Sequence, residues 1–243
     1  MDTLLLETQG GIATVTLNRP PMNAVNEQLL DELVEVCGEI EQDDSVQVVI
    51  LTGAGRAFSA GRELQGVLSG TEFPGGPRYR ALENLSKPVI AAVNGFCFTG
   101  SFELAMCADI IIASEKAVFG DTHMRFGVVP GGGQTQRLPK LIGVRKAKEL
   151  LFTCKRLSAE EAEQLGIVNR VVPHDKLLEE ARDMAKQILE NIPETISITK
   201  KLINQSMNLD LDTGLDLEAG YHEGGTIAPS PEGRKRIEGF LKA

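Results

Sequence analysis

Residues 94–109 read NGFCFTGSFELAMCAD, and this stretch says more about the fold than any other part of the chain. It follows the apolar run Pro88–Val93, which predicts a strand, and the small residues Thr99–Ser101 predict the start of a helix. Glu103 falls in the first turn of that helix among apolar neighbours. A carboxylate there could transfer protons beside an anion site, or it could simply complement the positive end of the helix dipole.

A second segment favours the proton-transfer interpretation. Residues 56–64 read RAFSAGREL and follow another apolar strand pattern, Val48–Gly53. Together the two segments resemble the crotonase superfamily, which contains the enoyl-CoA hydratases and isomerases. Further matching stretches are Thr16–Pro20, Pro130–Gly133 with Thr135–Leu138, and Ala162–Val171. One glycine-rich turn would be weak evidence, but these motifs follow one another in order over nearly the whole chain.

Length and charge limit the class of protein. The chain has 243 residues, of which 42% are hydrophobic, enough for one large α/β domain or for a domain with a small appendage. The net charge of −9 argues against nucleic acid or an anionic membrane as the main partner, although a phosphorylated ligand stays possible. No signal peptide and no membrane-length apolar run is recognisable, so we expect a cytoplasmic enzyme.

The cysteines do not suggest a metal site or a disulfide framework. Cys37, Cys97, Cys107 and Cys154 show no metal-type spacing, and each has apolar neighbours. We therefore expect four small buried hydrophobic side chains and no bound metal.

Alternating strand and helix patterns predict the α/β class. The predicted strands are Leu4–Glu7, Ile12–Leu17, Val48–Thr52, Val89–Val93, Ile110–Ala113 and Ile167–Val172. Ser158 with Glu161 predicts a capping box at the start of a helix that ends at Gly166. The Gly- and Pro-rich segment Ser69–Arg80 has no clear period, so we expect a mobile surface segment that borders a ligand site.

After Pro173 only helical patterns remain. Predicted helices there include Pro193–Asn208, Thr213–Glu223 and Pro231–Leu241. The resemblance implies a crotonase-like spiral of ββα turns with a C-terminal all-helical trimerisation region. We therefore expect a core at residues 1–190, an oligomerisation region at 191–243, and a homotrimer or a dimer of trimers.

The resemblance also implies that the protein binds an acyl-CoA thioester and stabilises the enolate that forms at its carbonyl. This needs two hydrogen-bond donors that converge on one oxygen. Matching the motifs residue by residue assigns these donors to the backbone N–H groups of Ala60 and Gly100. The alternative is that both segments are ordinary tight turns.

Hydration of an enoyl-CoA also needs proton transfer at adjacent carbons. Family hydratases use two glutamates; Glu103 matches the first, whereas His123 stands where the second is expected. His123 could be the second acid/base, could position the acyl group or a water, or could be a structural residue bonded to Asp121. We expect an enoyl-CoA hydratase. The alternatives are a double-bond isomerase that uses Glu103 alone, a catalytically silent acyl-CoA binder, or a structural oligomer without a ligand.

The CoA portion should contact further residues. The resemblance implies Arg19, Ser59 and Arg62 as substrate- or CoA-binding residues, with Gly131 bordering the acyl pocket. Phe240 and Lys242 would reach the ligand of a neighbouring subunit. The glycine loop 131–133 could instead serve only the entry into the next helix. No metal or redox cofactor is implied, because CoA arrives as part of the substrate.

Overall fold

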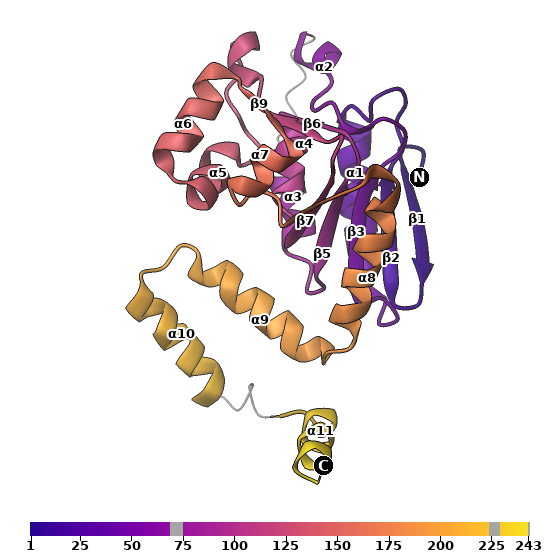
Figure 1. Ribbon diagram of the computed structural model, residues 1–243, viewed down its shortest axis with the longest axis vertical. Coiled ribbons are helices and arrows are strands. Elements are labelled where there is room, and N and C mark those ends of the chain that lie inside the picture. The colour runs from indigo at the N-terminus through magenta and orange to yellow at the C-terminus, as the bar shows by residue number, and fades with distance from the viewer. Residues whose placement is uncertain (69–74, 224–228, 243) are drawn as a thin grey trace.

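A six-stranded sheet forms the centre of the chain (Figure 1). The computed structural model describes residues 1–68, 75–223 and 229–242. The strands are β1 (Leu4–Gln9), β2 (Ile12–Leu17), β3 (Val48–Gly53), β5 (Val89–Val93), β7 (Ile110–Ser114) and β10 (Arg170–Val172), in that order across the sheet. The β1–β2 pair is antiparallel, and every later pair is parallel. The predicted α/β class is confirmed.

The continuous apolar run of β3 is explained by helices that cover both faces of this sheet. Val49 and Leu51 share one hydrophobic cluster with residues of α1 (Glu27–Gln42). Val48 and Ile50 point the other way, into a cluster with residues of α8 (Leu177–Leu189). Because successive side chains alternate across a strand, two covered faces need apolar residues at every position.

A second sheet lies beside the first and has four strands. They are β4 (Ala57–Ser59), β6 (Phe96–Phe98), β8 (Val118–Gly120) and β9 (Arg156–Ser158), in that order. The pairs β4–β6 and β6–β8 are parallel, and β8–β9 is antiparallel. Strands β3, β5 and β7 are each followed directly by one of these short strands, which gives the repeated two-strand turn of the predicted spiral.

Helices connect the strands. They are α2 (Leu64–Leu68), α3 (Gly75–Glu83), α4 (Gly100–Ala105), α5 (Gln134–Ile142), α6 (Val144–Thr153) and α7 (Ala159–Gln164), with short 3₁₀ turns η1 (His123–Phe126) and η2 (His174–Lys176). The capping box at Ser158 is confirmed. In the described part of the chain, no helix is long and apolar enough to span a bilayer.

Helix α3 corrects one expectation. Residues 75–80 of the segment predicted to be a mobile surface segment are helical, and Tyr79 and Leu82 on the inner face of α3 are buried. Pro77 lies in the first turn, where a missing N–H costs nothing because that group has no helical acceptor. Residues 69–74 of the same prediction lie outside the described residues.

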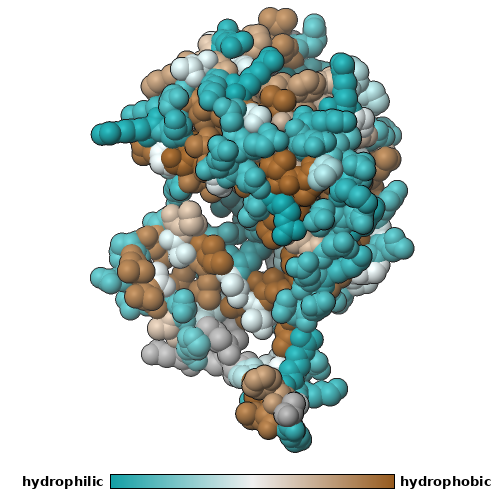
Figure 2. All heavy atoms as spheres, in the orientation of Figure 1, coloured by the Kyte–Doolittle hydropathy of each residue, from teal (hydrophilic) through white to brown (hydrophobic). Residues whose placement is uncertain are grey.

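The C-terminal helices extend away from the two sheets (Figure 1). They are α9 (Pro193–Ser206), α10 (Leu211–Glu223) and α11 (Pro231–Leu241). Lys200 on α9 attaches this region to the core: its Nζ lies 2.8 Å from an Asp109 carboxylate oxygen and donates to the Lys87 carbonyl at 2.9 Å. Apolar side chains gather on these helices (Figure 2), and the exposed ones include Leu211 and Leu215.

All four cysteines are buried and unpaired, as predicted. Burial raises the pKa of the Cys37 and Cys107 thiols to about 12. The Cys107 Sγ lies 3.4 Å from the backbone carbonyl oxygen of Glu103, one helical turn earlier. These thiols are therefore protonated and packed as small apolar groups.

Candidate active site

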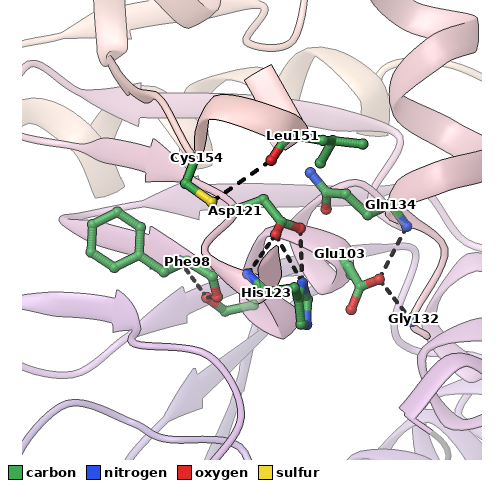
Figure 3. A network of polar contacts seen from close by, with 9 residues as sticks. Phe98, Glu103, Asp121, His123, Gly132, Gln134, Leu151 and Cys154 are labelled. Atoms are coloured by element: carbon green, nitrogen blue, oxygen red, sulfur yellow. Dashed lines mark hydrogen bonds and ion pairs between the residues drawn. The ribbon is translucent and has the colours of Figure 1, made fainter. Parts of the chain in front are cut away.

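The Glu103 carboxylate is the centre of the candidate site. Its side chain is buried in α4, and its Oε1 accepts the backbone N–H groups of Gly132 at 2.7 Å and of Gln134 at 3.1 Å. Figure 3 shows the carboxylate between this loop and the imidazole of His123. No described residue hydrogen-bonds Oε2. One oxygen of Glu103 is thus anchored by main chain, and the other is available to a ligand.

Glu103 has a perturbed acidity. Burial raises the pKa of this carboxyl above its ordinary value of 4.5, and the nearby charge of Asp121 adds to the rise. The hydrogen bonds from Gln134 and Gly132 and the attraction of His123 act in the opposite direction and do not cancel it. A carboxylate whose pKa is raised is a stronger base once ionised.

The loop that anchors Glu103 is itself fixed by Arg137. The Arg137 guanidinium makes a two-pronged contact with Glu83 of α3, at 3.0 and 2.8 Å, and donates to the Gly132 carbonyl at 2.9 Å. Gly132 has no room for a side chain, because a Cβ there would lie 2.5 Å from Glu103 Oε2. The position of the carboxylate therefore depends on glycine at 132 and on the clamp between α3 and α5.

His123 is held in a different way. Its Nδ1 lies 2.9 Å from both carboxylate oxygens of Asp121, and its backbone N–H also donates to Asp121 at 2.9 Å. Asp121 follows β8 directly and is 3% exposed, so the pair is buried. We assign the Nδ1 proton to the Asp121 bond, since a carboxylate can only accept. That tautomer leaves Nε2, which no described residue contacts by a hydrogen bond, to face a ligand.

The Asp121 pair also changes the acidity of the imidazole. Burial lowers the pKa of His123, but the hydrogen bond and the charge of Asp121, together with Glu103, outweigh it. The pKa of His123 is consequently raised above its ordinary value of 6.5, against a smaller opposing effect of Arg62. A protonated imidazole beside a carboxylate can donate a proton while the carboxylate accepts one.

The backbone amide of Arg62 faces the space beside Gly100. Val25 forms a parallel bridge with Arg62, in which the Val25 N–H donates to the Gly61 carbonyl at 2.8 Å and the Glu63 N–H donates to the Val25 carbonyl at 2.8 Å. Backbone groups alternate in direction along an extended segment. Because the Gly61 carbonyl and the Glu63 N–H both point toward Val25, the Arg62 N–H between them points away from Val25. A Cβ placed on Gly100 would lie 3.7 Å from the Arg62 backbone nitrogen.

The structure corrects the expectation that Ala60 is an oxyanion donor. The Ala60 N–H donates to the Met22 carbonyl at 2.9 Å and is used within the fold. The amide that approaches Gly100 belongs to Arg62, two residues later. The motif alone did not exclude Ala60, because a sequence does not reveal which way each N–H points.

Ser59 is also corrected. Its side chain is fully buried, and its hydroxyl accepts the Gly61 N–H at 3.1 Å while its carbonyl accepts the Ser101 hydroxyl at 2.7 Å. Ser59 therefore holds the turn between β4 and Arg62, and it is too enclosed to contact CoA. Its contribution to the site is structural.

The other predicted ligand-binding residues fall in three places. Arg19 pairs with Glu63 and donates to the Ala24 carbonyl at 3.0 Å, next to the half-buried Arg62. Gly131 is exposed, and the neighbouring Gly132 supplies the N–H that binds Glu103. Phe240 and Lys242 are exposed at the end of α11, far from α4 of the same chain (Figure 1).

Sequence reasoning missed the roles of Tyr79, Gly132 and Gln134. Tyr79 lay in the segment expected at the surface, and its hydroxyl comes within 2.8 Å of a Cβ placed on Gly100. The Gln134 carboxamide is fully buried, and neither of its polar atoms has a partner in the described part of the chain. Among the residues that the structure describes, no group of three or more metal-type ligands comes together.

Comparison with known proteins gives one consistent result. The family described as enoyl-CoA hydratase/isomerase matches residues 7–237. A short-chain-enoyl-CoA hydratase from Clostridium acetobutylicum is 43% identical over 228 residues, covering 90% of this chain and 87% of the relative. A crotonyl-CoA hydratase from Syntrophomonas wolfei is 37% identical, covering 90% and 87%. The crystal structure of an enoyl-CoA hydratase from Bacillus anthracis superposes with a TM-score of 0.92 at 34% identity, covering 99% and 96%.

Proposed function

The chain belongs to the enoyl-CoA hydratase/isomerase family, and from that premise we propose that it catalyses the reversible addition of water to a 2-enoyl-CoA thioester. The observation that carries the proposal is that the two carboxylate oxygens of Glu103 have different surroundings. One of its carboxylate oxygens is fixed by two main-chain N–H groups, while the other faces the space shared with Gly100 and the His123 side of the site.

Glu103 and His123 divide the proton transfers. Glu103 Oε2 accepts a proton from water as the water oxygen bonds to the β-carbon of the acyl group. The electron pair of the double bond moves toward the thioester carbonyl, and the α-carbon then takes a proton from His123 Nε2. Transfer of the proton from Glu103 back to His123 restores both groups. The raised pKa of each residue suits these roles.

The negative charge that develops on the thioester oxygen needs donors. We assign them to the backbone amides of Arg62 and Gly100, which lie on the same side of the site. Gly100 is the first residue of α4, a position whose N–H has no acceptor within the helix. One donor of this kind is typically worth about 100- to 1000-fold in rate.

CoA binding extends the proposal outward. Arg19 and Arg62 supply cationic groups at one end of the site for the CoA phosphates. Phe240 and Lys242 are too far away to serve their own subunit, so residues 191–243 would assemble the chain into a trimer or a dimer of trimers and carry them to a neighbour. The core would then be residues 1–190, in a cytoplasmic protein that uses neither a metal nor a redox cofactor.

Double-bond isomerisation is the second candidate. Both Asp121 oxygens are bonded to His123, so Glu103 is the carboxylate with an oxygen open to a ligand. A single carboxylate can move one proton between two carbons of the same enoyl chain. This reaction would not require His123 to give up a proton.

A screen of enoyl-CoA thioesters distinguishes hydration, isomerisation and binding without turnover. Wild type, Glu103→Gln and His123→Ala are given crotonyl-CoA and a 3-enoyl-CoA, and hydration and isomerisation are followed by absorbance and product analysis. Loss of hydration in both variants supports the Glu103–His123 pair. Isomerisation that survives in His123→Ala supports the second candidate. Binding of crotonyl-CoA without turnover identifies a silent binder, and absence of binding by calorimetry overturns the function altogether.

A further inference from the structure

The hydroxyl of Tyr79 lies inside the site, and neither family matching nor the proposed chemistry assigns it a task. Tyr79 is on the inner face of α3 and is 3% exposed. Its ring packs against two glycines: a Cβ on Gly75 would lie 3.1 Å from the ring, and a Cβ on Gly132 would lie 2.6 Å from it. The ring is thus fixed by its neighbours, and its hydroxyl is fixed with it.

Four polar atoms surround the space beside Gly100 that a side chain would fill. The ideal Cβ position there is 2.8 Å from the Tyr79 hydroxyl, 3.7 Å from the Arg62 backbone nitrogen and 3.9 Å from Glu103 Oε2. The fourth atom is the amide nitrogen of Gly100 itself. An oxygen atom that approaches the Gly100 backbone therefore enters a space that the phenol also reaches.

The Tyr79 hydroxyl is available there as a donor. No described residue forms a hydrogen bond with it, although buried tyrosine hydroxyls usually have a partner. Burial raises the pKa of Tyr79, and the nearby charge of Glu103 adds to the rise, with Arg62 opposing. The phenol stays protonated at any pH at which the enzyme would work, so it presents an O–H next to the developing charge.

We propose that Tyr79 donates a hydrogen bond to the thioester carbonyl oxygen, as a third donor beside the backbone amides of Arg62 and Gly100. This inference rests on the proposed function, since it names a further catalytic residue of the same site. The enolate oxygen gains a donor that is itself uncharged and is held by packing of its ring. Oxyanion donors are effective when they are fixed before the charge develops.

The test replaces Tyr79 by Phe, which keeps the ring between Gly75 and Gly132 and removes only the hydroxyl. We expect kcat for crotonyl-CoA to fall about 100-fold, as for loss of one oxyanion donor, with KM nearly unchanged. The matched control is Tyr221→Phe on α10, where the ring lies 5.9 Å from the Lys201 ammonium and away from the site. That variant should keep the wild-type kcat.

A spectroscopic measurement separates hydrogen bonding from packing. Infrared difference spectra of bound butyryl-CoA, labelled with ¹³C at the carbonyl, report polarisation of the thioester without turnover. The carbonyl stretch should lie at lower frequency in wild type and in Tyr221→Phe than for butyryl-CoA in solution. In Tyr79→Phe its frequency should rise part of the way toward the solution value. If the carbonyl frequency in Tyr79→Phe equals that of wild type, the proposal is overturned even if kcat falls. The hydroxyl would then position the attacking water or contribute to packing, and it would not bind the thioester oxygen.

Failure of the variant to fold would not end the test. In a Tyr221→Phe background, biosynthetic fluorotyrosine enters only position 79, since the chain has two tyrosines. Fluorination makes the phenol a stronger donor, so the carbonyl stretch should move to still lower frequency; no movement contradicts the proposal. If wild type neither binds nor hydrates the thioester, the proposed function is wrong. If wild type is active and the changes at Tyr79 leave the carbonyl frequency unaltered, only this inference is wrong.

Discussion

The two groups to which we assign proton transfer, Glu103 and His123, are held by different kinds of support. Glu103 is anchored by backbone N–H groups of Gly132 and Gln134, whereas His123 is anchored by one carboxylate side chain, that of Asp121. A backbone anchor is deleted only by substitution to proline, which lacks the N–H, and any other substitution can only displace it. A side-chain anchor can be removed while the backbone stays in place. The glutamate side should therefore respond to steric changes, and the histidine side to changes of charge.

The largest effect is expected on the glutamate side itself. Glu103→Gln keeps the shape and the hydrogen bonds to the loop but removes the base, so kcat for hydration should fall about 1000-fold, within the range for general acid–base groups. Steady-state kinetics with crotonyl-CoA measure this. Glu35→Gln, on the exposed face of α1, is the matched control and should behave as wild type. A Glu103→Gln enzyme within threefold of wild type would remove Glu103 from the chemistry.

Steric displacement of the same carboxylate should have the next largest effect. Gly132→Ala would place a methyl group 2.5 Å from Glu103 Oε2 and 2.6 Å from the Tyr79 ring. Misplacement by about 1 Å can cost about 100-fold, so we expect a loss of that order in kcat. Gly38→Ala on α1, whose added Cβ meets nothing within 4 Å, is the control. Wild-type kinetics in Gly132→Ala would mean that the loop at residue 132 shifts to make room for the methyl group without moving the Glu103 carboxylate.

Removing the charge on the histidine side should be milder. Asp121→Asn keeps a hydrogen-bonding side chain but deletes the charge that raises the pKa of His123. We expect kcat at neutral pH to fall by less than the roughly 100-fold that is the low end for loss of an acid–base group, because the imidazole itself stays in place. The alkaline limb of the pH profile should move to lower pH, because the imidazolium loses its proton more readily. A reduced rate with an unmoved limb would show that Asp121 acts only on the shape of the site.

The smallest change in rate is expected when the pH is varied for the wild-type enzyme. Glu103 must be ionised, so kcat/KM should fall as pH drops through a pKa above the ordinary carboxyl value of 4.5. His123 must be protonated, so the rate should also fall as pH rises through a pKa above 6.5. The expected profile is a bell whose alkaline limb disappears in His123→Ala. A rate that stays level to high pH in wild type would contradict the role of the imidazole as the acid.

The two sheets show which strands a sequence can reveal. Strands β3 and β5 are runs of buried apolar residues long enough to predict, and both were predicted. The second sheet was missed, because β4, β6, β8 and β9 have three residues each and no period can be recognised over that length. Their pairing depends on long-range contacts that bring successive turns of the spiral together.

The site shows a similar limit. Glu103 was predictable because an acidic residue among apolar ones is conspicuous, and Asp121 was recognised as a partner for His123. We propose the Arg62 amide in place of the donor expected at Ala60, because amide direction follows from the bridge with Val25 and not from residue type. Tyr79 stayed hidden in a glycine-rich stretch whose helix becomes evident only once its inner face is packed.

The buried thiol next to Glu103 gives the site a chemical reporter of its motions. Cys107, in the turn that follows α4, is 3% exposed and its pKa is raised, so an alkylating reagent can modify it only when the helix and this turn separate from their surroundings. The rate of labelling, compared with that of an unfolded chain, therefore measures how often this helix opens. Saturation with a thioester should slow the labelling in proportion to how tightly the ligand holds α4 closed.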